Sequence, residues 1–279
     1  MELTHEDVLN ILPDRNVDSH KGDYGKVLLL CGSRGYTGAA ALASMGALRC
    51  GAGLVYLGVP ESIYAIEAVK LNEPVVFPLP EKDGMLSVHA LDRILELLPK
   101  MDAVLIGCGM GCSADTLSVL ETVLRSYSGP VVLDADGINV LTGHIDVLRG
   151  RTGVTILTPH EVEFQRIGGT ITADRTESAK ILAKQTGVIV LLKGHRTVVT
   201  DGEDSYVNPT GNPGMAVGGS GDVLAGMITA LLGQGISPLE AAACGAWLHG
   251  AAGDMCAEEK GQYGMIPPDM LEVLSRLLK

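Results

Sequence analysis

A glycine-rich segment that runs directly into a predicted helix is the part of the sequence best suited to chemistry. Gly218-Gly219-Ser220-Gly221 precedes Asp222, and a helix is predicted over 222–232. Small residues before a helix expose several backbone N–H groups in one direction, and the positive end of the helix dipole adds to their effect. Such amides can stabilise charge on a transferring phosphoryl group while Asp222 accepts a hydroxyl proton. An acid in a first helical turn is equally compatible with a purely structural role.

A second candidate is the segment TPHEVE over 158–163, which follows a strand predicted over 155–157. Thr158 and Glu161 have the spacing of a capping box, which predicts that a helix begins at the proline between them. His160 and Glu163 are then left on one face of the first turn. Glu163 could bind Mg²⁺ through water, whereas a lone histidine at such a position is as readily a surface polar residue.

Polar residues also follow two other predicted strands. Asp134 and Asp136 end the strand predicted over 131–134, where metal or substrate groups are common, although turn chemistry explains Asp136 equally well. The segment after the strand predicted over 188–192 carries cations and a hydroxyl, namely Lys193, Gly194, His195, Arg196 and Thr197. This second segment fits either a phosphate contact or ordinary surface solvation.

Two familiar nucleotide motifs are missing from the sequence. Gly-x-x-x-x-Gly-Lys-Ser/Thr occurs nowhere, which excludes a P-loop NTPase. The glycines at 107, 109 and 111 have the wrong spacing for Gly-x-Gly-x-x-Gly, so a Rossmann dinucleotide site has little support.

Alternating strands and helices must position these segments. Strands are predicted over 26–31, 54–59, 74–79, 103–107, 131–134, 155–157 and 188–192, and a hairpin over 196–200 and 205–208. Helices are predicted over 37–49, 87–98, 115–126, 177–186, 222–232, 238–255 and 268–278. This order predicts an α/β fold in which a mainly parallel, open sheet carries helices, as one domain over 1–279. The prolines in 74–79 favour an edge strand.

Glycines are concentrated where this sheet would bind a ligand. Ligands lie outside the carboxyl ends of the strands in such folds. Three glycine-rich segments fall at those ends or at a helix start, over 32–38, 107–111 and 218–221. Because glycine allows a ligand to approach the main chain closely, we expect the ligand to be held by backbone atoms.

The composition excludes several other classes of protein. The 279 residues include 36 glycines but are 46% hydrophobic, which is enough to build a core. The net charge of −12 argues against non-specific binding to nucleic acid or anionic membrane, and 4% aromatics argues against single-strand stacking. Six cysteines at scattered spacings are predicted to be buried, reduced thiols. With no signal peptide and no apolar run of membrane-spanning length, a soluble cytoplasmic protein is expected.

Together these segments resemble a known family, the ADP/ATP-dependent NAD(P)H-hydrate dehydratases of the ribokinase-like superfamily. The similarity runs from about Gly22 onward, through GDYGKVLLLCGSRGYTGAAALA, VLDADGINVL, LTPHEVEF, LLKGHRT and GNPGMAVGGSGDVLAG. It implies a three-layer fold in which helices sandwich a central, mainly parallel sheet. It also implies a hydro-lyase that restores NAD(P)H from (6S)-NAD(P)HX, the cofactor hydrated at its nicotinamide ring. ADP, or ATP in other branches, would phosphorylate the ring hydroxyl with Mg²⁺, and phosphate would then be eliminated, leaving AMP.

The resemblance also implies roles for individual residues. Asp222 would be the catalytic base, beside an anion hole formed by Gly218, Gly219, Ser220 and Gly221. The nucleotide would be lined by Lys193, Gly194, His195, Arg196, Thr197 and Gly221. The hydrated dinucleotide would be lined by Ala39, Ala40, Ala41, Gly109, His160 and Asp222. Ribokinase-like kinases carry an Asn-x-x-Glu motif near Mg²⁺; here His160 replaces the asparagine and Glu163 is retained, which favours a dehydratase.

Two other functions are carried as alternatives. One is a ribokinase-like kinase acting on a thiazole or pyrimidine alcohol, and the other is a non-catalytic module that senses nucleotide. The presence of both Asp222 and Glu163 disfavours the second, because binding alone requires no base. The family resemblance implies a homo-oligomer, specifically a tetramer. Since only about 20 residues precede the matched region, too few for a domain, an epimerase of the hydrate is expected to be a separate protein.

Overall fold

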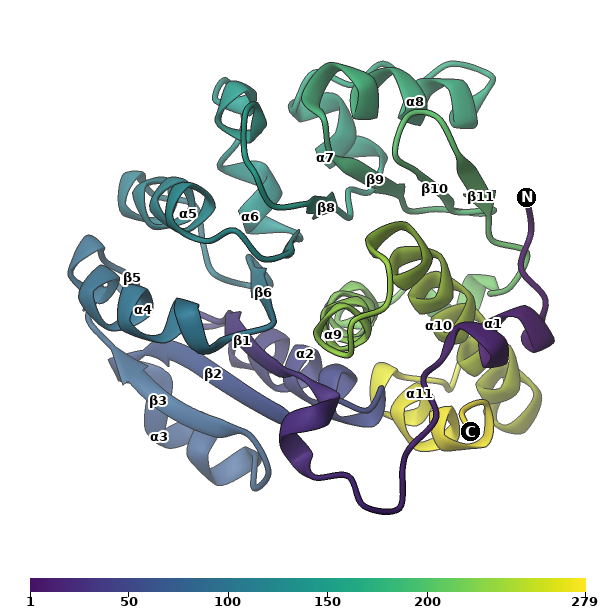
Figure 1. Cartoon of the computed structure of the whole chain (residues 1–279), viewed down its shortest axis with the longest axis horizontal. Helices are drawn as coiled ribbons and strands as arrows, with labels where there is room; N and C mark the ends of the chain where they lie inside the picture. The colour runs from purple at the N-terminus through teal and green to yellow at the C-terminus, as the bar shows by residue number, and fades with distance from the viewer.

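Nine strands form the central sheet in the order β11-β10-β9-β8-β7-β6-β1-β2-β3, as seen in a computed structural model that describes residues 1–279 (Figure 1). The strands are β1 (Lys26–Leu30), β2 (Leu54–Pro60), β3 (Val75–Leu79), β6 (Ala103–Ile106), β7 (Val131–Leu133), β8 (Thr155–Leu157), β9 (Ile189–Leu192), β10 (Val198–Thr200) and β11 (Ser205–Val207). All neighbours from β3 to β9 pair in parallel, and the β10–β11 hairpin adds the antiparallel pairs. A separate hairpin joins β4 (Glu81–Lys82) and β5 (Met85–Leu86).

Helices cover both faces of the sheet (Figure 1). One face carries α1 (His5–Ile11), α2 (Thr37–Arg49), α3 (Glu61–Lys70), α9 (Ser220–Gly233), α10 (Pro238–Lys260) and α11 (Pro267–Val273). The other carries α4 (Leu91–Leu97), α5 (Ala114–Ser126), α6 (Asp136–Asn139), α7 (Glu161–Arg166) and α8 (Arg175–Thr186). The strands read as continuous apolar runs because they are buried on both sides. In β1, Val27 and Leu29 join one core cluster while Leu28 and Leu30 join the other.

The three-layer α/β fold predicted from the sequence is therefore confirmed. The strand over 74–79 is an edge strand, as its prolines predicted, and the predicted helix over 37–49 has the observed bounds of α2. The sequence reasoning missed α1 and α3. Only Ile63 and Glu67 are buried in α3, so this helix lacks the apolar periodicity that marks α5. The predicted helix over 87–98 is divided, because a 3-10 turn over Val88–Ala90 precedes α4.

The strand order reverses at β1, which creates a topological switch point at the carboxyl ends of β1 and β6, and we refer to the space outside these strand ends as the crevice. After β1 the chain proceeds to β2 and β3 on one side, and it later returns to β6 on the other side of β1. Loops that follow β1 and β6 therefore diverge at this switch point, which is where ligands bind in open α/β sheets. Helix α9 packs against both β1 and β6, so its N-terminus is available to the same crevice.

Glycines bring α2 and α9 into backbone contact. A Cβ atom on Gly226 would lie 2.0 Å from the carbonyl oxygen of Ala43, and one on Gly46 would lie 2.5 Å from that of Val223. No side chain can be inserted at either position without moving a helix. The two helices that border the crevice are thus held at a fixed separation.

The structure bears on two further predictions, one about membrane-spanning segments and one about the cysteines. None of the helices has the length and apolar character needed to cross a membrane. All six cysteines are unpaired and five are buried, but Cys112 is exposed, so the prediction of uniform burial is wrong for that residue. Cys112 lies on the loop before α5, and its thiol donates to Asp136.

Candidate active site

Helix α9 begins in the crevice with several backbone amides unused. Gly219, with φ of +97°, caps the helix without a side-chain bond. The amide of Ser220 donates to the Val217 carbonyl over 3.3 Å, but those of Gly218, Gly219, Gly221 and Asp222 have no partner within the protein. This is the arrangement of an anion site at a helix N-terminus.

Asp222 lies in the first turn of α9, beside two other groups that could bind a proton or a cation. Ligand atoms of Asp222, Asp134 and Cys108 all lie within 4.8 Å of one another. Burial and the charge of Asp134 raise the pKa of Asp222 to about 6, against the lowering effects of Cys108 and Lys193. A carboxylate with this pKa is ionised at neutral pH and is a stronger base than an exposed one, which suits proton abstraction.

Asp134 is held by three donors. Its Oδ1 accepts from Lys193 Nζ over 2.8 Å and from Thr158 Oγ1 over 2.7 Å, and its Oδ2 accepts from Cys108 Sγ over 3.5 Å. The residue is 2% exposed and follows β7 directly. The next residue, Ala135, has φ of +48°, a conformation that costs a non-glycine residue energy and is frequent at functional sites. Sequence reasoning noted Asp134 at a strand end but did not select it for the site.

Lys193 brings its ammonium group to the start of α9. Its Nζ lies 3.9 Å from Glu163 Oε2, and a Cβ atom placed on Gly221 would lie 3.3 Å from it. Burial lowers the pKa of Lys193, but the carboxylates of Asp134 and Glu163 outweigh that effect and raise it. The side chain therefore stays charged beside the free amides, and glycine at 221 leaves the ammonium group open to them.

The rest of the predicted nucleotide segment forms a turn at the surface. His195 and Arg196 are exposed, and the Arg196 side chain pairs with Glu2 in the N-terminal segment. Thr197 Oγ1 accepts from the Gly194 amide over 3.3 Å, which fixes the turn. Within this segment, Lys193 has its ammonium group beside the α9 terminus.

His160 and Glu163 form a capping box of their own at the start of α7. His160 Nδ1 accepts from the amides of Val162 and Glu163 over 3.1 and 3.2 Å, and Glu163 Oε2 accepts from the His160 amide over 2.9 Å. The predicted box between Thr158 and Glu161 is therefore wrong. Pro159 still belongs to the extended segment, since its carbonyl accepts from the Lys193 amide over 2.8 Å, and the helix begins at Glu161.

Glu163 is the carboxylate in this arrangement that fits a metal role. It is 4% exposed, and its Oε2 also faces Lys193. Mg²⁺ commonly keeps several waters and contacts one or two carboxylates together with substrate phosphates. The carboxylate of Glu163 is therefore suited to hold Mg²⁺ through a water molecule.

The loops that follow β1 and β6 form the opposite wall of the crevice. The Gly32 amide donates to the Cys108 carbonyl and Ser33 Oγ donates to the Gly109 carbonyl, each over 2.8 Å. Gly109 has φ of +61°, and a Cβ atom there would lie 2.8 Å from Ala39 Cβ. Ala39 and Ala41 are half-buried, whereas the Ala40 side chain faces the core. Ala39 and Gly109 are thus neighbours, as is required if both line the same bound dinucleotide.

A buried histidine lies behind the anion site and was missed from the sequence. His249 of α10 has its Nε2 3.2 Å from Ser220 Oγ. Burial lowers the pKa of His249 to about 4, so the ring is neutral at pH 7. No local motif marks this residue, because its partner lies on a different helix. The pair fixes the side chain of the first residue of α9.

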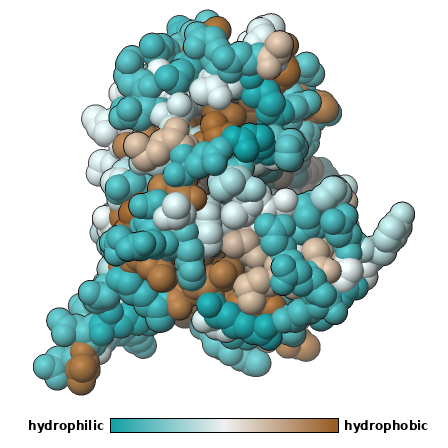
Figure 2. All heavy atoms as spheres, turned by 90° about the vertical axis from the view of Figure 1, so that its right-hand side faces the viewer, coloured by the Kyte–Doolittle hydropathy of each residue, from teal (hydrophilic) through white to brown (hydrophobic).

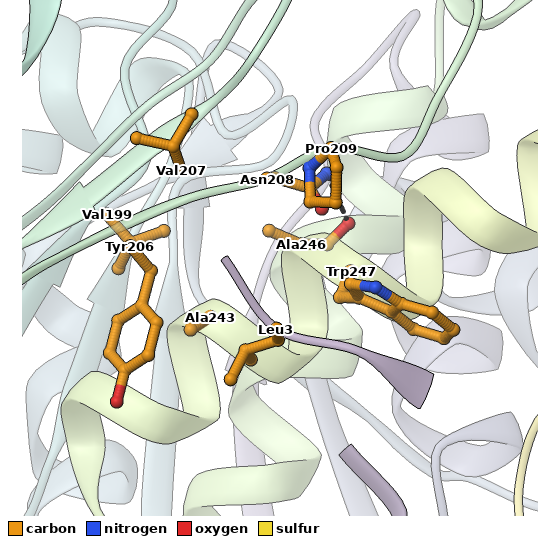
Figure 3. A pocket seen from close by; sticks show the side chains of 9 residues that line it. All are labelled: Leu3, Val199, Tyr206, Val207, Asn208, Pro209, Ala243, Ala246 and Trp247. Atoms are coloured by element: carbon orange, nitrogen blue, oxygen red, sulfur yellow. Dashed lines mark hydrogen bonds between the residues drawn. The ribbon is translucent and has the colours of Figure 1, made fainter. Parts of the chain in front are cut away.

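The apolar pocket at the N-terminal segment is separate from this site. It lies between that segment, the β10–β11 hairpin and α10, and Figure 3 shows the side chains that line it, namely Leu3, Val199, Tyr206, Val207, Asn208, Pro209, Ala243, Ala246 and Trp247. The Asn208 amide group donates to the Ala246 carbonyl over 3.1 Å. On the face turned to the viewer in Figure 2, hydrophobic atoms form separate patches among hydrophilic ones. The pocket contains none of the predicted site residues.

Comparison with known proteins matches the chain to one enzyme family. The sequence model of the NAD(P)H-hydrate dehydratase family matches residues 27–276. The chain is 46% identical over 275 residues to the bifunctional NAD(P)H-hydrate repair enzyme Nnr of Moorella thermoacetica, a match over 96% of this chain and 52% of that protein. It therefore spans about half the length of the first curated relatives that it matches.

Two further relatives are matched over most of their own length. The ADP-dependent (S)-NAD(P)H-hydrate dehydratase of Neisseria meningitidis is 37% identical over 262 residues, covering 90% of this chain and 84% of that protein. The crystal structure of the ADP/ATP-dependent NAD(P)H-hydrate dehydratase of Bacillus subtilis, co-crystallised with ATP/Mg²⁺, superimposes with a TM-score of 0.86 at 33% identity. That match covers 98% of this chain and 96% of the Bacillus chain.

Proposed function

Because the chain belongs to the NAD(P)H-hydrate dehydratase family and has its ribokinase-like fold, we propose that it dehydrates (6S)-NAD(P)HX to NAD(P)H. ADP or ATP supplies the phosphoryl group, and with ADP the products are AMP and phosphate. Support comes from the family match over 27–276 and from the Neisseria and Bacillus relatives. A thiazole or pyrimidine alcohol kinase is not favoured.

One observation carries the proposed mechanism, namely the position of Asp222 beside unused backbone amides. Ligand atoms of Asp222 and Asp134 lie within 4.8 Å of each other, and Asp134 in turn binds Lys193. Asp222 takes the proton of the ring hydroxyl while that oxygen bonds to the terminal phosphorus of the nucleotide. The bond between this phosphorus and its bridging oxygen breaks, so AMP leaves when ADP is the donor. The amides of Gly218, Gly219 and Gly221 and the Lys193 ammonium stabilise the charge on the phosphoryl oxygens.

The second step uses the new phosphate as a leaving group. The bond between the ring carbon and its oxygen breaks, phosphate departs, and loss of a proton from the neighbouring carbon forms the ring double bond. Hydroxide is a poor leaving group and phosphate is a good one, which explains why a kinase-like fold serves a lyase reaction. When bound, Mg²⁺ would neutralise phosphate charge, and Glu163 would hold it through water.

The dinucleotide is assigned to the opposite wall of the crevice. Ala39, Ala41 and Gly109 border it on the loops after β1 and β6, and His160 lies at the start of α7 with half its side chain exposed. Ala40 would contribute through its backbone, because its side chain is in the core. Nucleotide and dinucleotide then approach Asp222 from two sides.

The test is recovery of NADH absorbance from hydrated NADH with ADP or ATP and Mg²⁺. Asp222→Asn should lower kcat by about 1000-fold or more, since a general base contributes 100- to 10,000-fold. Asp115→Asn is the matched control, because Asp115 also lies in a first helical turn, that of α5, outside the site. Wild-type turnover in Asp222→Asn would contradict the assignment. A stable phosphorylated product would point to a kinase, and tight ADP binding without turnover to a sensing module.

Partner and assembly assignments extend this proposal. An NAD(P)HX epimerase is proposed as the functional partner, supported by the bifunctional name of the Moorella relative. A homo-oligomer, specifically a tetramer, is proposed from the family resemblance, and light scattering would test it. The cytoplasmic location stays a prediction from the sequence, to be tested by fractionation.

A further inference from the structure

The site contains a carboxylate that the proposed reaction does not use. Asp134 is 2% exposed, and both of its oxygens accept hydrogen bonds. It is too strongly bound to act as a base, because Lys193, Thr158 and Cys108 already donate to it. Asp134 nevertheless lies within the site, because it contacts Lys193 and is close to Asp222.

We infer that Asp134 is a positioning residue, whose carboxylate holds the Lys193 ammonium group beside Gly221 so that this cation meets the phosphoryl group at the anion hole. The inference rests on the proposed function and deepens it. It assigns to Asp134 no contact with substrate. Its effect on the phosphoryl group is exerted through Lys193.

The lengths of the contacts support this role. Lys193 Nζ is 2.8 Å from Asp134 Oδ1 but 3.9 Å from Glu163 Oε2, so Asp134 determines where the ammonium group lies. A lysine side chain has four rotatable bonds and a point charge, which makes its position dependent on its partner. Without Asp134, Glu163 would become the nearest carboxylate and would draw the ammonium group away from Gly221.

The carboxylate is itself held rigidly. Thr158 Oγ1 donates to the same oxygen that receives Lys193, over 2.7 Å, and its own position is fixed by its place after β8. Cys108, after β6, donates to the other oxygen. The ends of β6, β7 and β8 therefore together determine the orientation of the Asp134 carboxylate. Such a supporting arrangement is what holds a catalytic group within a fraction of an ångström.

The decisive experiment is a double-mutant cycle between Asp134→Asn and Lys193→Met, measured as kcat and as KM for ADP. Each single variant should lower kcat by about 100-fold, the loss expected when a charged group is misplaced by an ångström. The double variant should be at most a few-fold slower than Lys193→Met alone, because Asp134 reaches the phosphoryl group through the lysine and only its smaller effect on the pKa of Asp222 is left. If the two losses multiply, or if Asp134→Asn keeps wild-type kcat, the inference is overturned.

Direct ADP binding by calorimetry gives a readout independent of turnover. Positioning predicts that Asp134→Asn weakens ADP binding, whereas simple removal of a negative charge would tighten it. In the Lys193→Met background, Asp134→Asn should no longer weaken binding. These outcomes stand even if the wild type produces no NADH, so failure of this inference and failure of the proposed function are distinguishable.

Two further variants separate positioning from stability. Thr158→Val removes one donor to Asp134 without altering any charge, and it should lower kcat by less than Asp134→Asn while the melting temperature changes little. Asp269→Asn breaks a comparable ion pair with Lys260, outside the site, and should leave both kcat and ADP binding unchanged. Equal kcat losses in Asp134→Asn and Asp269→Asn would assign Asp134 a merely structural role and overturn the inference.

Discussion

Asp222 is kept in an environment that works against its charged form. Burial is the largest contribution to its raised pKa, and the nearby Asp134 carboxylate is the next. Both effects make the ionised side chain a better proton acceptor. The same effects make the folded protein less tolerant of the charge, so Asp222 links the chemistry of the site to the stability of the chain.

The pH dependence of turnover should report this carboxylate. A base must be deprotonated, and the pKa of Asp222 is raised to about 6. We therefore expect kcat/KM to be level above pH 7 and to fall about tenfold per unit well below pH 6. A profile measured with saturating Mg²⁺ between pH 5 and 8.5 would check this. A fall that begins only near pH 4 would show that the titrating base is another group.

Removing the charge at Asp222 should stabilise the protein while it abolishes turnover. The folded-state pKa is raised above that of the unfolded chain, so folded molecules hold the proton more tightly and the stability decreases as pH rises from about 4 to 6. At pH 8, Asp222→Asn should unfold with about 1 to 2 kcal/mol more free energy than wild type. Urea denaturation at pH 8 and at pH 4.5 should show the advantage shrinking as the pH is lowered. A less stable variant at pH 8 would contradict the assigned environment.

At the scale of elements, the site depends on the contact between α2 and α9. The main chains of these helices touch at Gly46 and Gly226, and the helices begin on either side of the crevice. In the proposed site the N-terminus of α9 supplies the anion hole, while α2 begins beside Gly109. Their separation would therefore set the width of the site between the two proposed substrates.

Gly226→Ala should disrupt both stability and site geometry. The added Cβ would lie 2.0 Å from the Ala43 carbonyl oxygen, so one helix must move, and we expect a loss of about 3 kcal/mol in the free energy of unfolding. Gly38→Ala on α2 is the matched control, because a Cβ there meets nothing within 4 Å. Urea denaturation would check both. Equal stability of the two variants would contradict the tight contact.

Local sequence signals predicted elements well where packing and propensity agree. The alanine-rich segment of α2 and the apolar run of β1 are predicted correctly, because the residue types in and around each segment favour one kind of secondary structure. The start of α7 was misplaced, since the Pro159 carbonyl bonds to Lys193, a residue distant in the sequence. The roles of Asp134 and His249 depend on partners from other strands and helices, and pairings of that kind have no local signature. The family motifs indicate which residues gather, and contacts such as that between Lys193 and Asp134 depend on the fold.

At the scale of the whole molecule, one sheet with two covered faces predicts one cooperative unit. The core clusters on either side share strands, since alternate residues of β1 belong to each. Losing one layer would expose the strands of the other. We expect a single calorimetric transition, with equal van't Hoff and calorimetric enthalpies, shifted upward by ADP and Mg²⁺. Two resolved transitions would contradict the assignment of one domain over 1–279.

The unused amides at the start of α9 also bear on how such a site changes under mutation. Every amino acid except proline carries a backbone N–H, so no other single substitution deletes one of these donors outright. Replacing Gly218, where an added Cβ would meet nothing within 4 Å, should leave the anion hole in place. In the proposed site we therefore expect variation in the reaction to arise in the surrounding side chains, His160 and Lys193 among them, while the amides that would hold phosphate persist. A site built on backbone amides would keep its affinity for phosphate while the reaction at the bound phosphate changes.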